Sequence, residues 1–380
     1  MVNKTKYIYE HQDWNNFKCD YHKLMPLLLE VRNLQGRVIG KMGSLGFKFQ
    51  DQANLEMVTQ DVLKSSEIEG EILNPEQVRS SIARQLGLDI AGSVPSNRNV
   101  DGVVEMMLDA TVNFKKPLTK ERLFGWHNSL FPTGYSGIHK IITGSWRDDS
   151  EGSMQVVSGS LGKEKIHYQA PPAKLIDKQM ENFIDWVNSS QEIDPVIKSA
   201  LAHLWFVTLH PFDDGNGRIA RAITDMLLAR ADNQSQRFYS MSSQIRNERQ
   251  QYYDILEKTQ KGSPDVTYWI EWFLNCLSNA LQASEIILSK IIFKHNFLQN
   301  NAGKLENDRQ KKIINMLLDD FEGKLTSSKW AKIGKCSKDT ALRDIQYLLN
   351  KQILIKLPGG GRSTGYALNI GQNSDSSGKE

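Results

Sequence analysis

The residues best suited to chemistry lie in one twelve-residue string, HPFDDGNGRIAR, which runs from His210 to Arg221. Its glycines form a tight loop before a helix start, where backbone N–H groups converge at the positive end of the helix and suit a phosphate. Arg218 and Arg221 stand three positions apart on the first helical turn, so both guanidinium groups can grip one oligophosphate. Asp214 offers a hard oxygen ligand for Mg²⁺. His210, at the entry to the loop, can take a proton from an attacking hydroxyl.

Each part of this string also has an ordinary structural interpretation. A single histidine after an apolar helix is more often a core residue, GNG is usually a turn, and two arginines three apart usually cover a solvated helix face. The combination within twelve residues is rare by chance, so we interpret the string as a phosphate site. It is not a P-loop, because the pattern G-x-x-x-x-G-K-[ST] does not occur in the sequence.

The string resembles the Fic family motif HPFx[D/E]GNGRxxR and matches it at every fixed position. The resemblance implies that His210 is the general base, that Asp214 holds Mg²⁺ and that Phe212 anchors the loop in the core. It implies transfer of AMP from ATP to Ser, Thr or Tyr hydroxyls of a protein, including the enzyme itself, with ATP and Mg²⁺ as the required cofactors. The implied nucleotide-binding positions in the string are Asp214, Gly215, Asn216, Gly217, Arg218, Ile219, Ala220 and Arg221.

A second match lies upstream, where SSEIEG at residues 65–70 resembles the family's inhibitory signature [S/T]xxxE[G/N]. Glu69 stands in the last turn of an expected helix, where the helix dipole disfavours a carboxylate and a cationic partner is expected. The resemblance implies that this partner is Arg221, so that Glu69 takes the place of the ATP γ-phosphate. Ser65, four residues earlier, is expected to steady the carboxylate, and Gly70 to end the helix. Taken alone the pattern indicates a capped surface helix; two neighbouring acids, Glu67 and Glu71, do not satisfy it.

Between residues 134 and 172 repeated glycines interrupt the chain, and short β-type runs at 154–157 and 165–168 predict a β-hairpin. The hairpin resembles the family's flap, whose edge would pair with an extended segment of the target protein; an ordinary surface hairpin is the alternative. The resemblance also implies that Tyr252 lines the adenine pocket. Tyr253 is the alternative to Tyr252, and a core aromatic pair is a further alternative. Gln260 stands where an adenine-contacting Asn is expected. The flap and adenine residues implied are Val157, Ser158, Gly159 and Tyr252.

Most of the chain has apolar residues at helical spacing, which predicts a mainly α fold: a Fic-type helical bundle with a β-hairpin flap and a C-terminal winged helix-turn-helix. The expected divisions are an N-terminal helical region with the inhibitory helix, the catalytic core, a linker, the winged helix and a disordered tail. Their bounds are 1–98, 99–298, 299–307, 308–370 and 371–380.

The winged helix is expected from three short helical segments followed by two strand-like runs. Between Lys304 and Tyr366 there are 13 Lys and Arg against 7 Asp and Glu, so the chain's positive charge gathers there. A recognition helix from about residue 337 and a phosphate contact by Arg362 in the wing would suit DNA. Protein docking is the equal alternative for this segment.

Composition places further bounds on the function. Of 380 residues, 39% are hydrophobic and 24% charged, which is ordinary for a soluble globular protein. Three dispersed cysteines without a CxxC pair favour neither a disulfide framework nor a zinc site. Because no secretory or membrane-spanning pattern is present, we expect a cytoplasmic protein with no membrane partner. The resemblance adds a homodimer, and two alternative functions remain: a hydrolase that removes AMP from proteins, and a DNA-binding regulator that senses nucleotide.

Overall fold

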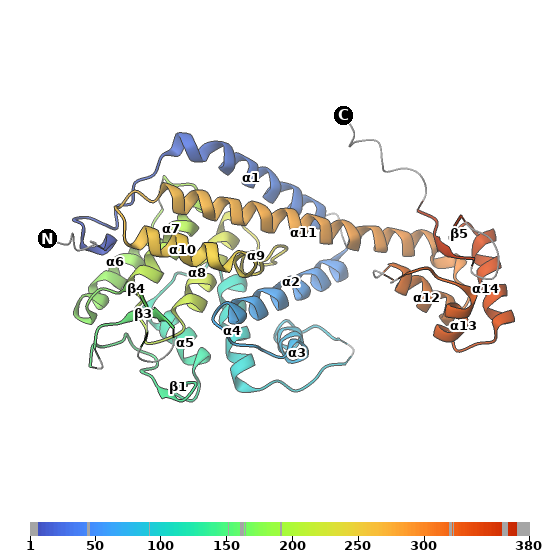
Figure 1. The fold of residues 1–380 in the computed structure, drawn as a ribbon, viewed down its shortest axis with the longest axis horizontal. Coiled ribbons are helices and arrows are strands. Elements are labelled where there is room, and N and C mark those ends of the chain that lie inside the picture. The colour runs from blue at the N-terminus through green and yellow to red at the C-terminus, as the bar shows by residue number, and fades with distance from the viewer. Residues whose placement is uncertain are drawn as a thin grey trace. The chain divides into compact units, whose positions relative to one another are not determined.

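The computed structural model describes residues 7–43, 46–90, 92–150, 152–159, 163, 165–190, 192–318, 321, 323–358 and 364–370. The fold is mainly helical, as predicted, and it divides into two compact units, Met1–Leu288 and Ser289–Glu380 (Figure 1). None of the described helices is both long and apolar enough to cross a membrane.

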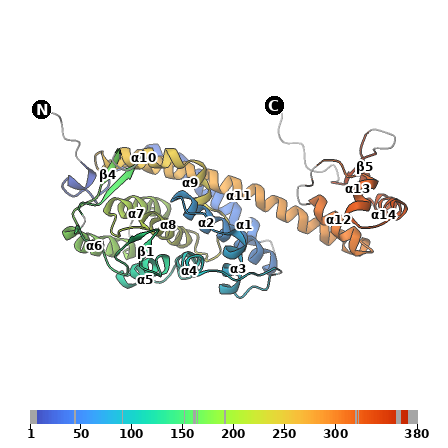
Figure 2. The same ribbon diagram turned by 60° about the horizontal axis from the view of Figure 1, so that its bottom comes forward.

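The first unit is a helical bundle with small hairpins on it (Figure 2). The described strands of this unit form two antiparallel pairs. Its helices are α1 (Tyr21–Gly43), α2 (Phe47–Ile68), α3 (Pro75–Gln85), α4 (Arg98–Val112), α5 (Lys120–Leu130), α6 (Ile176–Asn188), α7 (Pro195–Leu209), α8 (Asn216–Asp232), α9 (Met241–Asn247), α10 (Arg249–Gln260) and the first part of α11 (Thr267–Asn301), and its strands are β1 (Tyr135–Ser136), β2 (His139–Lys140), β3 (Gln155–Ser158) and β4 (Lys165–Gln169).

Helix α7 forms the centre of this unit and aims its C-terminus at the loop of the phosphate motif. The Asp194 carboxylate caps its N-terminus by accepting from the Val196 N–H, and Pro195 fills the first position. From Val196 on it is buried almost all round, as expected of an apolar helix in the middle of a bundle, and it packs along α8. The helix stops at His210 because Pro211 follows.

Helix α2, expected to carry the inhibitory signature, is part of the core. It packs against α3, α4, α8 and α9. Its Asp61 carboxylate accepts from the Ser240 hydroxyl and the Ser242 N–H, which fastens α2 to the start of α9. The helix ends at Ile68, one residue earlier than expected, so Glu69 is its C-cap.

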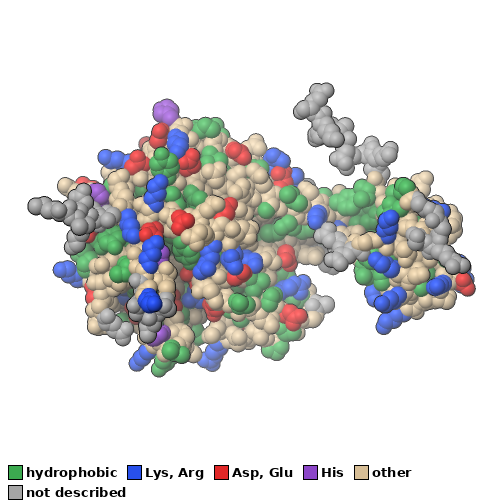
Figure 3. Space-filling view, viewed as in Figure 1, with side chains coloured by type: hydrophobic (Ala, Val, Ile, Leu, Met, Phe, Trp, Pro, Cys, Tyr) green, Lys and Arg blue, Asp and Glu red, His purple; other side chains and the backbone are tan. Residues whose placement is uncertain are grey.

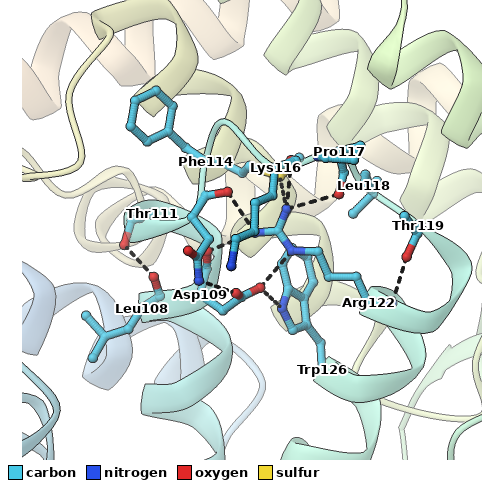
Figure 4. A network of polar contacts seen from close by, with 12 residues as sticks. Leu108, Asp109, Thr111, Phe114, Lys116, Pro117, Leu118, Thr119, Arg122 and Trp126 are labelled. Atoms are coloured by element: carbon cyan, nitrogen blue, oxygen red, sulfur yellow. Dashed lines mark hydrogen bonds and ion pairs between the residues drawn. The ribbon is translucent and has the colours of Figure 1, made fainter.

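The pair α4 and α5 is joined by a polar network around Arg122 (Figure 4). The Arg122 Nε donates to the Asp109 carboxylate at 2.7 Å, and its NH2 donates to the Asp109 carbonyl at 2.8 Å. The indole N–H of Trp126 donates to the same carboxylate. This network fixes α5, which carries His127 and leads to Phe131, both of which reach the motif loop.

The predicted hairpin between 154 and 168 is confirmed: β3 and β4 pair antiparallel, with Gln155 opposite Gln169 and Ser158 opposite Lys165. The register shifts between Val156 and Val157. Residues 160–162 and 164 at the tip lie outside the described part.

The second unit has the order of elements expected at the C-terminus: three helices and a two-stranded ribbon around buried Trp330 and Ile345. These are α12 (Asp308–Leu318), α13 (Ser327–Ile333), α14 (Lys338–Asn350), β5 (Leu354–Lys356) and β6 (Tyr366–Leu368). The expected linker 299–307 is helical in its first part, because α11 continues to Asn301 and a 3-10 turn follows at Ala302–Lys304. Phe297 packs in the core of this unit, which accounts for the extension of the helix. Arg362 and the tail 371–380 lie outside the described residues.

Candidate functional site

The loop of the motif begins with a residue in a rarely used backbone conformation. His210 is the C-cap of α7 and has φ 49° and ψ 57°, in the left-handed region. Such a conformation in a non-glycine residue persists only where neighbours hold it. Arg147, whose side chain is fully buried, does so: its Nε donates to the His210 carbonyl at 2.7 Å, and its NH2 donates to the Pro171 carbonyl at 2.6 Å.

The imidazole of His210 is held as a neutral base. Its Nδ1 lies 3.3 Å from the Val207 carbonyl oxygen, and because a carbonyl only accepts, Nδ1 carries the hydrogen. The Nε2 atom is therefore left as the proton acceptor. Burial lowers the pKa of His210 to about 4, so the ring is neutral at physiological pH. The structure thus gives the predicted base the protonation state that it needs.

Asn216 and Phe212 close the loop on itself. The Asn216 side-chain oxygen accepts from the Phe212 N–H at 3.0 Å, and its amide donates to the Phe212 carbonyl at 2.8 Å. The Phe212 ring stacks on His127 at 4.2 Å between centroids, and His127 Nε2 donates to the Asp214 carbonyl at 3.2 Å. Burial lowers the pKa of His127 to about 4, so this ring is also neutral. Phe212 is the predicted anchor, whereas His127 was missed, since a histidine on the buried side of an amphipathic helix gives no signal in the sequence.

The N-terminus of α8, where the glycines predict a phosphate site, faces a carboxylate of the chain itself. Gly215 has φ 77° and precedes the first helical residue, Asn216, so the first N–H groups of α8 have no carbonyl partner within the helix. A Cβ atom on Gly217 would lie 2.1 Å from the Glu69 Oε1. A carboxylate therefore rests directly on the Gly217 backbone, at the positive end of the helix dipole.

Arg221 forms an ion pair with that carboxylate. Its side chain is almost fully buried; NH2 donates to Glu69 Oε1 at 2.8 Å and to the Ser65 carbonyl at 2.9 Å, and Nε donates to the Ser65 hydroxyl. Its NH1 has no hydrogen-bond partner among the described residues and lies 3.2 Å from the place of a Gly217 Cβ. The predicted pairing of Glu69 with Arg221 is thus present. Ser65 acts on the other partner than expected, because its hydroxyl holds the guanidinium and not the carboxylate.

Gly70 completes the signature as a helix stop. It has φ +86°, its N–H donates to the Glu67 carbonyl, and the Glu71 N–H donates to the Ser66 carbonyl. This is the Schellman arrangement, which favours glycine. The next residue was missed from the sequence: Glu71 Oε2 lies 2.7 Å from Arg218 NH1, so both arginines of the motif hold a carboxylate.

Asp214, the predicted metal ligand, is half-buried in the loop. Its Oδ2 accepts from the Ser136 hydroxyl on β1, and its Oδ1 accepts from the Gly215 N–H. Within the described ranges no group of three or more His, Cys, Asp or Glu side chains is placed to hold a metal. A single carboxylate fits Mg²⁺, which commonly takes one or two protein carboxylates and completes its shell with phosphates and water.

The flap and adenine residues make contacts of their own, and the Tyr253 hydroxyl donates to the Ile68 carbonyl at the end of α2. Ser158 shares a hydrogen bond of 2.6 Å with His167, whose other ring nitrogen lies 2.6 Å from Glu257 on α10, and this ties the hairpin to that helix. Tyr252 is buried and its hydroxyl bonds to His203 at 2.8 Å, as in the alternative of a core residue. The other residues of interest are a half-exposed Val157, Gly159 with φ 110°, a partly buried Tyr253, and Gln260, which donates to the Val207 carbonyl.

Residues 117–228 match the Fic/DOC family, and residues 7–88 match a domain of unknown function, DUF4172. Relatives named protein adenylyltransferase Fic from Drosophila willistoni and Aedes aegypti are each 27% identical over 60% of this chain and 42% of their own length. The match thus spans less than half of these relatives.

Solved structures show the same fold at 19% identity. A Fic family protein from Desulfovibrio desulfuricans G20 aligns with a TM-score of 0.52 over 90% of this chain and 96% of its own. A Fic domain containing signaling protein from Bacteroides thetaiotaomicron VPI-5482 aligns with a TM-score of 0.50 over 69% and 95%. The resemblance of the twelve-residue string is therefore confirmed: the chain carries a Fic/DOC family domain at residues 117–228, which includes the string.

Proposed function

We propose that this protein transfers AMP from ATP to Ser, Thr or Tyr hydroxyls of a protein target, including itself, and that Glu69 inhibits the transfer. One observation carries the proposal. A neutral histidine whose Nε2 is unprotonated precedes a helix N-terminus, where a carboxylate now rests on Gly217 and Arg221. The curated relatives bear the name protein adenylyltransferase, which supports the same reaction.

In this mechanism the phosphates of ATP rest on the loop Gly215–Gly217, gripped by Arg218 and Arg221. The target hydroxyl gives its proton to Nε2 of His210 while its oxygen attacks the α-phosphorus. The bond from that phosphorus to the bridging oxygen breaks, and pyrophosphate leaves. General-base help of this kind contributes roughly 10²- to 10⁴-fold. Asp214 would hold Mg²⁺, which supplies positive charge beside the phosphates.

Inhibition follows from competition for one place. The Glu69 carboxylate occupies the Gly217 backbone and the Arg221 guanidinium, the same groups that an ATP phosphate would use. Both cannot bind there together, because two anions would meet at contact distance. Release of Glu69 would therefore admit ATP in the productive position.

The target is proposed to bind as an extended segment along the β3–β4 hairpin by strand addition. The hairpin supports this role because Gln155, Val157 and Ser158 are exposed along β3. Its tie to α10 through His167 and Glu257 would hold the flap in place beside the helix that carries Tyr252.

The test is intact mass after incubation with ATP and Mg²⁺. We expect Glu69→Gly to gain the mass of AMP, the wild type to gain little, and Glu69→Gly/His210→Ala to gain none. A matched control, Glu67→Gly, changes a neighbouring glutamate that pairs with Lys64 and Arg246 outside the motif, and it should behave as the wild type. Equal adducts with and without His210 would remove the proposed base from the reaction. If no variant forms an adduct but the protein strips AMP from a modified protein, the hydrolase alternative takes its place.

For the second unit we propose DNA contact through α14. Several Lys and Arg side chains lie on the face of this unit that Figure 3 shows. On α14 itself Lys338 and Arg343 are exposed, beside an exposed Leu342. A gel shift of double-stranded DNA with wild type and Lys338→Glu/Arg343→Glu tests this: a shift that the double variant loses supports DNA, and no shift favours protein docking.

A further inference from the structure

We propose that Glu71 is a second inhibitory residue, which occupies Arg218 as Glu69 occupies Arg221, so that ATP has to displace two carboxylates. The inference rests on the proposed function in one respect, namely that the phosphates of a nucleotide bind at these arginines. It assigns a role to a glutamate outside the inhibitory signature. It also identifies the resting state of the site as one in which both motif arginines are neutralised.

The contact between Glu71 and Arg218 is built into the site. The Arg218 side chain is only 7% exposed, and its NH1 lies 2.7 Å from Glu71 Oε2. The guanidinium carbon lies 5.0 Å from the centroid of the Phe131 ring, which limits its movement. Because the Arg218 guanidinium is held in place and largely shielded from water, a carboxylate bound to it competes directly with a phosphate oxygen. The Glu71 side chain is 36% exposed, so it can leave toward solvent.

The backbone presents the two carboxylates as a pair. Glu69 is the C-cap of α2 and Glu71 follows after Gly70, whose φ of +86° reverses the chain direction within one residue. The Glu71 N–H donates to the Ser66 carbonyl at 3.0 Å, so this turn is fixed to the end of α2. The acids therefore face the motif arginines in matched order, with Glu69 on Arg221 and Glu71 on Arg218.

The charge balance of the site predicts how far the loss of Glu69 alone releases it. In the resting site two carboxylates balance two guanidinium groups. Removal of the Glu69 side chain frees Arg221 alone, and Arg218 keeps its carboxylate next to the loop that has to receive a polyanion. We therefore expect Glu69→Gly to be only partly released, and a second step of release when Glu71 loses its charge as well.

A nearby glutamate provides the control. Glu67 lies on the last turn of α2, and its carboxylate pairs with Lys64 at 2.6 Å and with Arg246 at 2.9 Å, neither of which belongs to the motif. Glu67→Gln and Glu71→Gln remove the same charge from the same end of α2. A general electrostatic effect on a polyanion would appear in both variants, whereas competition for Arg218 would appear only in Glu71→Gln.

The experiment is isothermal titration calorimetry with α,β-methylene-ATP and Mg²⁺, a probe that cannot transfer AMP. We expect Glu69→Gly/Glu71→Gln to bind the probe about fivefold more tightly than Glu69→Gly, the factor for an ion pair of about 1 kcal/mol. Glu69→Gly/Glu67→Gln should bind like Glu69→Gly. Melting curves of all variants check that they fold, which is expected because the three glutamate side chains are at least partly exposed.

Equal affinities in the Glu71 and Glu67 variants would overturn the inference, and so would a failure of every variant to bind the probe. The outcome is separable from that of the proposed function because the probe reports binding alone. A fivefold gain without any AMP adduct in the mass assay would keep Glu71 as a second inhibitory residue and reject AMP transfer. Adducts without that gain would do the reverse.

Discussion

Removal of Glu69 is expected to destabilise the protein while it opens the nucleotide site. In Glu69→Ala the Arg221 guanidinium, 2% exposed, still donates to the Ser65 hydroxyl and carbonyl but loses its counter-charge. Breaking a fully buried ion pair by removing one partner costs about 3–5 kcal/mol. The Glu69 side chain is 32% exposed, so water reaches this site. We therefore expect the free energy of unfolding to fall by less than for a fully buried pair, by about 2–3 kcal/mol. For a unit of this size that lowers the Tm by roughly 3–5 °C.

The assay is thermal unfolding of wild type, Glu69→Ala and Glu67→Ala, each with and without ATP and Mg²⁺. The control variant breaks the more exposed pairs of Glu67 with Lys64 and Arg246, so it should lose at most about 1 kcal/mol. ATP at a hundred times its Kd adds about 2.7 kcal/mol, which would offset most of the loss in Glu69→Ala. The wild type should gain less, because its site is occupied by Glu69.

Two results would refute this reasoning. If Glu69→Ala melts no lower than Glu67→Ala, Arg221 does not depend on Glu69 for its counter-charge. If Glu69→Ala does melt lower but ATP raises its Tm no more than that of the wild type, the vacated place does not receive a phosphate.

Three further predictions follow from the same contacts. Burial lowers the pKa of His210 to about 4, so kcat/KM of the released enzyme should be flat from pH 6 to 8 and fall only as the ring becomes protonated toward that value; a midpoint near 6 in the pH–rate profile would contradict this. Gly217→Ala in the Glu69→Gly background should bind ATP at least about tenfold more weakly by calorimetry, because the methyl group fills the anion site; unchanged affinity would place the phosphates elsewhere. Asp344→Ala should lower the free energy of unfolding of the second unit by about 2–3 kcal/mol, because the carboxylate accepts from Arg309 and the buried Trp330. Proteolysis within residues 289–370 should rise, while ATP-dependent melting of the first unit stays as in the wild type. Equal proteolysis of variant and wild type would contradict the role of Asp344.

The sequence was most informative where one short segment carries several constraints. From His210 to Arg221, loop glycines, helix start and paired arginines occur together, and the structure brings them to one place. The helices around them were also predictable, because apolar spacing persists over several turns. Helices α3 and α9 give little signal of this kind, since few of their residues are apolar.

The sequence did not predict contacts between segments that lie far apart in the chain. Arg147 holds the His210 carbonyl across 63 positions, and Ser136 reaches Asp214 across 78, with nothing in either local sequence to signal it. Glu71 was set aside because it lies one residue beyond the signature, yet the left-handed turn at Gly70 directs it to Arg218. Such pairings depend on how the chain reverses, which residue types alone do not reveal.

The burial of α2 in the bundle limits the ways in which the proposed inhibition by Glu69 can be relieved. Asp61, Ser65, Ser66 and Ile68 are all buried, and the helix packs on four others, so the segment that we propose to be inhibitory is a permanent part of the same folding unit. The local concentration of the inhibitor is therefore fixed by the covalent chain and does not fall when the protein is diluted or scarce. A basal rate per molecule independent of abundance is the expected result. Relief has to come from a small rearrangement at residues 65–71, because loss of the whole helix would take the fold with it.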